Sequence, residues 1–189
     1  LSGSTILLSD NNKECLILST TGWKERSIQE PSVEKTTRGP RDSFTENIEV
    51  NTSMLRRRIK HSNLQIEKYN KGLYSNTKIK VVYVKAIVNP DIVKEVKQRL
   101  KKINVSCLNN PIHLSELIED NPNSPFDTIF YSERPDAISA GILEGRVAIM
   151  VDNSPTVLLV PKLFIENIIS ADDYYSRFWF TFFLRQIRI

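Results

Sequence analysis

The sequence predicts an α/β protein with two related subdomains, each a small mixed sheet with helices and a β-hairpin. Strand-like apolar runs alternate with helical apolar stripes along most of the chain. In addition, residues 1–11 (LSGSTILLSDN) match residues 143–153 (LEGRVAIMVDN) at Leu, Gly, Asp and Asn with one constant offset. In both copies a strand runs into an Asp-Asn turn and a second apolar strand follows, which is typical of a β-hairpin. Chance similarity between two hairpins is the alternative.

The first subdomain is expected over residues 1–69. If the repeat is real, this subdomain is incomplete at its N-terminus, because the elements that would precede its hairpin are missing. A charged loop follows over residues 21–42, and we expect it to be anchored, because long loops without structure are uncommon in compact domains. A helix should then begin at Ser43, with Glu46 as its capping-box partner. Its apolar stripe consists of Phe44, Ile48, Leu55 and Ile59.

The second subdomain is expected over residues 77–162, after a polar linker at residues 70–76 that contains Gly72. Its expected elements are a strand (78–88), a helix capped by Asn89 with Pro90 at its first position, a shorter helix (114–120), a strand (128–131), a helix from Pro135 to Gly145, and the second hairpin. Residues 163–189 would form a C-terminal juxtamembrane helical segment.

Composition excludes several classes of protein. The chain has 189 residues and a formal net charge of +4, and its basic residues are mixed with acidic ones, which argues against nucleic-acid binding. Cys15 and Cys107 lie in or beside apolar runs and are interpreted as buried free thiols in a reducing compartment, with a disulfide as the alternative. The sequence contains neither a signal peptide nor an apolar run of about 18 residues.

Signals of catalysis are scarce. The two histidines, His61 and His113, stand beside polar loop residues without catalytic spacing, and no nucleophile or phosphate-binding motif is present. We therefore expect no enzymatic activity, no metal site and no cofactor.

The clearest candidate site combines the charged loop with the helix that follows it. Asn51 falls inside the apolar stripe of this helix and Arg58 lies at its edge, so both polar groups need partners. The charged residues of the loop are the nearest candidates. We expect Arg38 or Arg41 to pair with an acidic residue, and Asn51 to bond to the backbone of the loop. The candidate acidic residues are Glu30, Glu34 and Glu46. The role would be to lock the loop in place, with a subunit contact as a further option.

The C-terminal stretch is aromatic on one side and basic on the other. On a helix, Arg177, Arg185 and Arg188 share one narrow stripe, while Trp179 and several phenylalanines cover most of the rest. This pattern suits a membrane interface with the arginines on the cytoplasmic side. The alternative is an ordinary core helix.

Several strings resemble the A subunit of bacterial spore germinant receptors, the GerA family. They are EPSVEKTTRGPRDSFTENIEVNTSMLRRRIK (30–60), ELIEDNPNSPF (116–126), ERPD (133–136), LEGRVAIMVDNSPTVLLVP (143–161) and DDYYSRFW (172–179). The resemblance covers essentially the whole chain. One departure is Ser43-Phe44, where members of the family often have Gly-Phe.

The resemblance implies the cytosolic domain of a membrane-bound receptor that takes part in nutrient-triggered germination and ion release. It implies B and C subunits as partners, self-association, a membrane part after Ile189, and a place on the core side of the spore inner membrane. The alternative function is a small-metabolite binding module that uses the cleft between two α/β subdomains. A ligand of this chain is left open.

Overall fold

A five-stranded antiparallel sheet forms the centre of the structure, a computed structural model that describes residues 4–8, 15–19, 40, 42–108, 110–119, 127–163 and 166. Its strand order is β3-β4-β6-β7-β5, and every neighbouring pair is antiparallel. The strands are β3 (Leu64–Lys71), β4 (Thr77–Val84), β5 (Phe130–Ser132), β6 (Val147–Val151) and β7 (Val157–Val160). The expected α/β class is therefore confirmed, although the sheet is antiparallel and not mixed.

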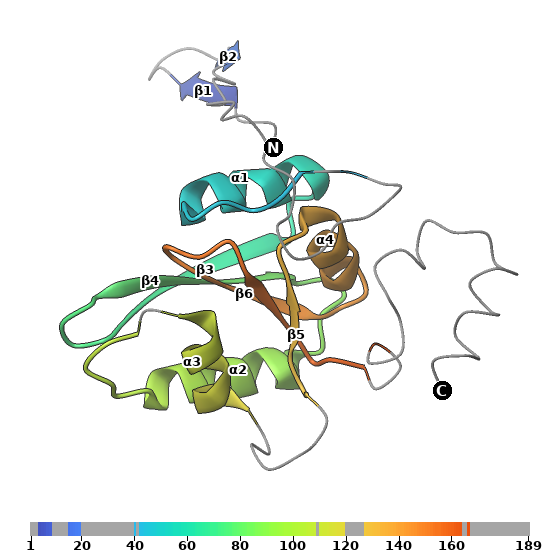
Figure 1. Ribbon diagram of the computed structural model, residues 1–189. Helices are drawn as coiled ribbons and strands as arrows, with labels where there is room; N and C mark the ends of the chain where they lie inside the picture. Colours follow the sequence, from blue (N-terminus) through green and yellow to red (C-terminus); the bar gives the residue numbers. More distant parts are fainter. Residues whose placement is uncertain are drawn as a thin grey trace, which may run out of the picture.

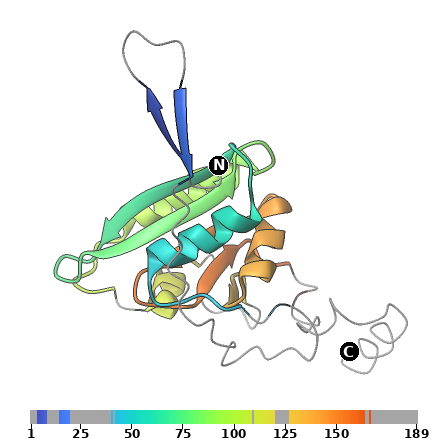
Figure 2. The ribbon, with the colours of Figure 1, turned by 90° about the horizontal axis from the view of Figure 1, so that it is seen from above.

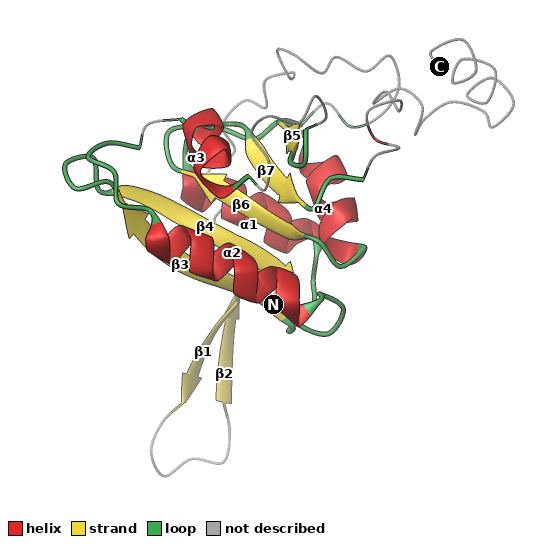
Figure 3. Cartoon of the chain, turned by 90° about the horizontal axis from the view of Figure 1, so that it is seen from below, coloured by secondary structure: helices red, strands yellow, loops and turns green. Residues whose placement is uncertain are grey.

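Four helices cover the two faces of this sheet. Helices α1 (Ile48–Arg58) and α4 (Pro135–Leu143) lie on one face, and α2 (Pro90–Lys102) and α3 (Pro111–Ile118) lie on the other (Figures 1 and 3). Seen from above, α1 and α4 lie side by side over the sheet (Figure 2). Within the described residues, no helix is long and apolar enough to cross a membrane.

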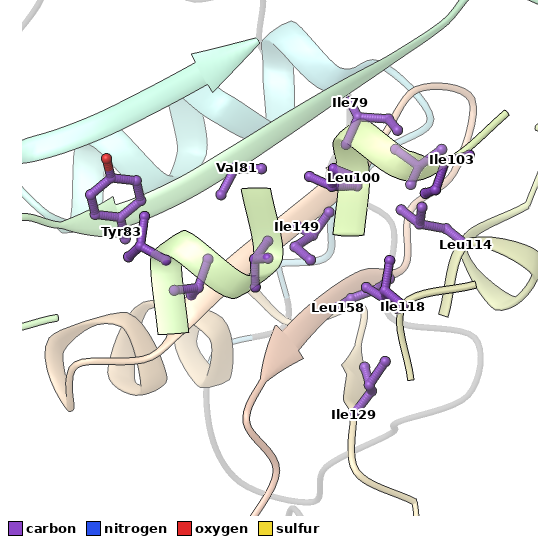
Figure 4. Close-up of a cluster of buried hydrophobic side chains, with 14 of the residues drawn as sticks. Ile79, Val81, Tyr83, Leu100, Ile103, Leu114, Ile118, Ile129, Ile149 and Leu158 are labelled. Atoms are coloured by element: carbon purple, nitrogen blue, oxygen red, sulfur yellow. The ribbon is translucent and has the colours of Figure 1, made fainter. Parts of the chain in front are cut away.

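The apolar runs of β4 and β6 follow from this three-layer arrangement. A strand covered on both faces buries every residue, so its sequence reads as a nearly continuous apolar run. Along β4, Ile79 and Val81 point toward α2 and α3, where they join Leu100 and Leu114 (Figure 4). Val82, the residue after Val81, belongs to the cluster beneath α1 and α4. One core therefore lies on each side of the sheet.

The helices of the second half begin and end close to where the sequence predicts. Asn89 caps α2 by accepting a hydrogen bond from the N–H of Asp91, and Pro90 is the first helical residue. Helix α3 starts at Pro111 after an Asn110 cap, three residues earlier than expected. After α4 the chain turns at Gly145, whose φ of +92° favours glycine.

The predicted start of α1 is wrong. Asn47, and not Ser43, caps this helix, because its side-chain oxygen accepts from the N–H groups of Glu49 and Val50. Glu46 stands outside the helix and is exposed. Phe44 also precedes the helix but is buried in the same cluster as Ile48 and Leu55, so the expected apolar stripe does reach the core.

The two predicted hairpins are both present and share one register. Strands β1 (Ser4–Leu8) and β2 (Cys15–Ser19) form a separate two-stranded antiparallel sheet. The offset between Leu1 and Leu143 is 142 residues (143 − 1). When 142 is added to both members of the pair Thr5↔Leu18, the result is Val147↔Val160, which is a pair of β6 and β7. The other three pairs of β6 and β7 follow in the same way.

Two related subdomains are not shown. Helix α1, within the residues 1–69 expected as the first subdomain, packs on the same sheet as residues 77–160. Strand β3, which was not predicted from the sequence, pairs with β4 of that sheet. The stretch expected as a linker, residues 70–76, forms the end of β3 and the turn into β4. Cys107 also differs from expectation, because its side chain is exposed and not buried.

Candidate functional site

The segment of residues 42–47, just before α1, is held against the domain by groups from three parts of the chain. Asn51, in α1, makes two hydrogen bonds to it. The amide Nδ2 donates to the carbonyl of Thr45 at 2.6 Å, and Oδ1 accepts from the N–H of Thr45 at 2.7 Å. Asn51 is 1% exposed, so these bonds satisfy an amide that would otherwise be costly to bury.

Two turns from the second half of the chain hold the same segment. The carbonyl of Glu133, between β5 and α4, accepts from the N–H of Phe44 at 2.8 Å and from the hydroxyl of Ser43 at 3.1 Å. Between β6 and β7, the N–H of Asn153 donates to the carbonyl of Glu46 at 2.9 Å. Asp152 accepts from the N–H of Ile48 at 3.3 Å, which places a carboxylate at the positive end of α1. We call Asn51, Glu133, Asp152 and Asn153 the α1 clamp.

Arg58 bonds to Asp42 at the beginning of the segment, with 2.5 Å between Nη2 and Oδ2. Its partner thus belongs to the charged stretch that the sequence singles out. Glu30, Arg38 and Arg41 lie outside the described residues, so their expected pairing stays a prediction. A role in locking the loop also stays a prediction. It was expected of Glu30, Arg38, Arg41, Asn51 and Arg58.

A buried lysine joins α1 to the sheet beside the clamp. Lys80, in the centre of β4, is 2% exposed, and its ammonium lies 2.7 Å from Oε2 of Glu49 and 2.9 Å from the hydroxyl of Thr52. The hydrogen bond from Lys80 lowers the pKa of Glu49. Sequence reasoning missed Lys80. The signal that could have found it is a cation inside an apolar run long enough to be a strand covered on both faces.

Two buried arginines fix the ends of neighbouring elements. At the start of α4, Arg134 binds both carboxylate oxygens of Asp136, at 3.1 and 2.6 Å. At the start of β6, Arg146 binds Glu144 and the largely buried Glu166, which follows β7. Burial alone would lower the pKa of Arg146, but hydrogen bonds from its guanidinium to Glu166 and Glu144 raise it on balance.

The groups of the site hold residues 42–47 and α1 in place on the sheet. Its groups are amides, backbone groups and ion pairs that satisfy one another. Within the part of the chain that the structure describes, no three His, Cys, Asp or Glu side chains gather as a metal site requires. His61 accepts from the N–H of Asn63, and both it and His113 are exposed.

The contacts of the clamp bring together three of the strings on which the family resemblance rests. Asn51 and residues 42–47 come from the first string, Glu133 from ERPD, and Asp152 and Asn153 from the string that begins at Leu143. Arg177, Trp179, Arg185 and Arg188 lie outside the described residues.

Comparison with known proteins gives one consistent answer. All residues, 1–189, match the family model described as Bacillus/Clostridium GerA spore germination protein. The chain is 44% identical over 187 residues to spore germination protein KA of Bacillus subtilis (strain 168), covering 99% of this chain and 34% of that protein. It is 36% identical over 188 residues to the membrane protein YfkQ of the same organism, covering 100% of this chain and 37% of that protein.

A solved structure agrees with the sequence matches. It is the crystal structure of the N-terminal domain of the A subunit of the Bacillus megaterium spore germinant receptor GerK3, with a TM-score of 0.52 and 41% identity. The similarity covers 65% of this chain and 98% of that chain. This chain spans about a third of the length of the two curated relatives, namely 34% of spore germination protein KA and 37% of YfkQ. The family and these relatives are described as germination or membrane proteins and not as enzymes. The chain belongs to the GerA family of spore germination proteins and is homologous to the N-terminal domain of a germinant receptor A subunit.

Proposed function

We propose that this chain is the cytosolic domain of a membrane-bound germinant receptor A subunit, where it transmits the nutrient signal and does not catalyse a reaction. The receptor would lie in the spore inner membrane with this domain on the core side. It would act with B and C subunits and with further copies of this chain, and the outcome would be ion release followed by germination. Membership of the GerA family supports this proposal.

The observation that carries the proposal is the α1 clamp. Transmission needs an element whose position can be fixed or released, because a signal is a shift between two arrangements. Residues 42–47 are such an element, since Asn51 of the following helix and two turns distant in sequence, at Glu133 and Asn153, hold them. The segment also connects the main sheet to the preceding charged loop and the hairpin β1–β2. Release of the clamp would therefore uncouple those parts of the chain.

We infer further that the hairpin β1–β2 belongs to a first unit with the fold of the main sheet. Its register equals that of β6–β7 after the offset of 142 residues, 143 − 1. In the main sheet, β6 pairs with β4 and β7 pairs with β5. Equivalent neighbours for β1 and β2 would come from this first unit. The division into two subdomains is thus kept as a proposal, with α1 and β3 assigned to the second one.

The C-terminal residues 173–189 would be the juxtamembrane helix that couples the domain to the bilayer. Trp179 would lie near the headgroups, with Arg177, Arg185 and Arg188 on the cytoplasmic side.

Spores provide the test of function. In a strain whose other GerA-family genes are deleted, the complete gene is replaced by variants, and loss of optical density is followed after adding a mixture of amino acids and sugars. Deletion of the gene should abolish the response. Arg58→Ala should slow it at an unchanged amount of receptor in the inner membrane, because the Arg58–Asp42 pair is partly exposed and contributes little to folding.

Arg56→Ala is the matched control, because Arg56 is an exposed arginine of the same helix. It should germinate like the wild type. A normal response in the deletion strain contradicts the role in germination. A normal response with Asn51→Ala contradicts the role of the α1 clamp. A normal response with Arg58→Ala contradicts a role of the Arg58–Asp42 pair in holding the same segment.

A further inference from the structure

Two loops lie side by side at one end of the sheet and support each other. They are the turn between β3 and β4, residues 72–76, and the loop after α2, residues 103–108, and we call them together the double-loop tip (Figures 1 and 3). The N–H groups of Leu73 and Tyr74 donate to the carbonyls of Val105 and Ser106 at 3.0 and 2.9 Å. The hydroxyl of Ser75 accepts from the N–H of Leu108 at 3.1 Å.

The double-loop tip presents two large apolar side chains to solvent. Leu73 is 75% exposed and Tyr74 is 83% exposed, and no other large apolar side chain within residues 42–108, 110–119 and 127–163 is as exposed. Gly72, with a φ of +90°, and Asn76, with a φ of 43°, set the shape of the turn. Because the backbone of this turn is fixed by the second loop, little ordering is needed when the two side chains are buried by a partner.

The two stretches of chain that form the tip carry basic residues and no acidic ones. The sequence has no acidic residue between Glu67 and Asp91, and none between Glu95 and Glu116. Lys101 and Lys102, just before the second loop, are exposed. Lys71 is directed at the carbonyls of Lys101 and Ile103, at 3.1 and 3.2 Å, and not at a carboxylate. These lysines favour an anionic surface as the one that binds here.

We propose that the double-loop tip docks on an anionic lipid bilayer, with Leu73 and Tyr74 entering the headgroup region and the lysines contacting lipid phosphates. A stable protein interface buries about 800 Å² on each partner. Two side chains of about 150–250 Å² each supply too little apolar area for that. Two apolar side chains beside exposed lysines do suit a bilayer, where apolar insertion and attraction to anionic lipid act together.

The exposed thiol of Cys107 allows a direct test, because it lies in the second loop of the tip. In a Cys15→Ser variant of the 189-residue chain, an environment-sensitive fluorophore is attached to Cys107. Vesicles of phosphatidylglycerol and phosphatidylcholine should raise and blue-shift its emission, and added salt should reverse the change. Vesicles of phosphatidylcholine alone should have no effect.

The matched control carries the fluorophore at the other end of β4. Ile87→Cys, made together with Cys15→Ser and Cys107→Ser, labels an exposed position beyond the far end of a strand about 26 Å long. Its emission should not change. Leu73→Ser with Tyr74→Ser should weaken vesicle binding at least about ten-fold. Lys101→Ala with Lys102→Ala should weaken it about thirty-fold, from about 1 kcal/mol for each lysine.

Four results would overturn the proposal. In the first, the chain binds neither kind of vesicle. In the second, it binds both kinds equally well. In the third, it binds anionic vesicles while the emission of the label at Cys107 does not change and the tip variants bind like the wild type, so that residues outside the tip make the contact. In the fourth, vesicles are not bound and light scattering shows self-association that Leu73→Ser with Tyr74→Ser abolishes, which assigns the tip to a second copy of this chain.

Discussion

The two faces of the main sheet are packed by different chemistry. On the α2/α3 face the core is apolar, and its buried polar groups Thr77 and Ser115 are hydroxyls that donate to backbone carbonyls. On the α1/α4 face, the ammonium of Lys80 and the amide of Asn51 are buried as well. Apolar packing tolerates adjustment, whereas a buried amide or charge requires its partners in fixed places. On the α1/α4 face, a displacement of one segment therefore disturbs the segments bonded to it.

The largest expected effect on stability comes from Asn51→Ala. It removes the bonds to both backbone groups of Thr45 and leaves these groups partly buried without their partner. We expect a loss of about 3 kcal/mol in the free energy of unfolding, at about 1–3 kcal/mol for each group. Urea denaturation of the purified chain measures it. Ser115→Ala, on the other face, removes one neutral hydroxyl and should cost about 1 kcal/mol. Equal losses would show that the two faces do not differ.

The second largest effect is expected from the ion pair beneath α1, where substitution of Glu49 and substitution of Lys80 should differ in their cost. Glu49→Ala should cost about 1–2 kcal/mol, because it leaves the buried ammonium of Lys80 with the hydroxyl of Thr52 alone. Lys80→Met should stay within about 1 kcal/mol of the wild type, because it replaces the cation by an apolar chain of similar size. Glu49 is 63% exposed and finds water when Lys80 is gone. If Lys80→Met proves the more harmful change, the ion pair is a net source of stability.

Apolar periodicity was enough to predict most of the fold. The apolar stripe of α2, its Asn89 cap, the start of α4 at Pro135 and the hairpin β6–β7 all depend on residues close together in the sequence. The start of α1 was missed because Ser43 and Asn47 are both good caps, and the choice between them depends on the contact of Ser43 with Glu133. The division into subdomains placed β3 apart from β4 because the turn at residues 72–76 reads like a linker.

The contacts of the candidate site could be predicted only in part. Asn51 was identified because an amide inside an apolar stripe needs a partner, and the partner is indeed near in sequence. Glu133 and Asn153 could not be found in this way, because they contribute backbone groups and backbone hydrogen bonding leaves no trace in residue identity. Lys80 was missed because the alternation of Lys78, Ile79, Lys80 and Val81 suggests a solvent-facing lysine, whereas α1 covers it.

The smallest effect should appear at high pH and belongs to the α2/α3 side alone. There Glu67 accepts from the hydroxyls of Tyr69 and Tyr83 and from Lys97, and burial followed by the bond to Glu67 raises the pKa of Tyr69 to about 12. The unfolded chain loses this proton near pH 10 and the folded chain near pH 12. Stability from this group is therefore complete below pH 10 and is lost as the pH rises toward about 12.

Urea denaturation between these two pH values measures the loss, and Tyr69→Phe should make it smaller. Glu67→Gln should reduce it only in part, because burial, the largest cause of the raised pKa of Tyr69, persists. Asn51→Ala lies on the other face and should lower stability equally at both ends of this range. An alkaline loss that Tyr69→Phe leaves unchanged, or that Asn51→Ala alters, would place its origin outside this cluster.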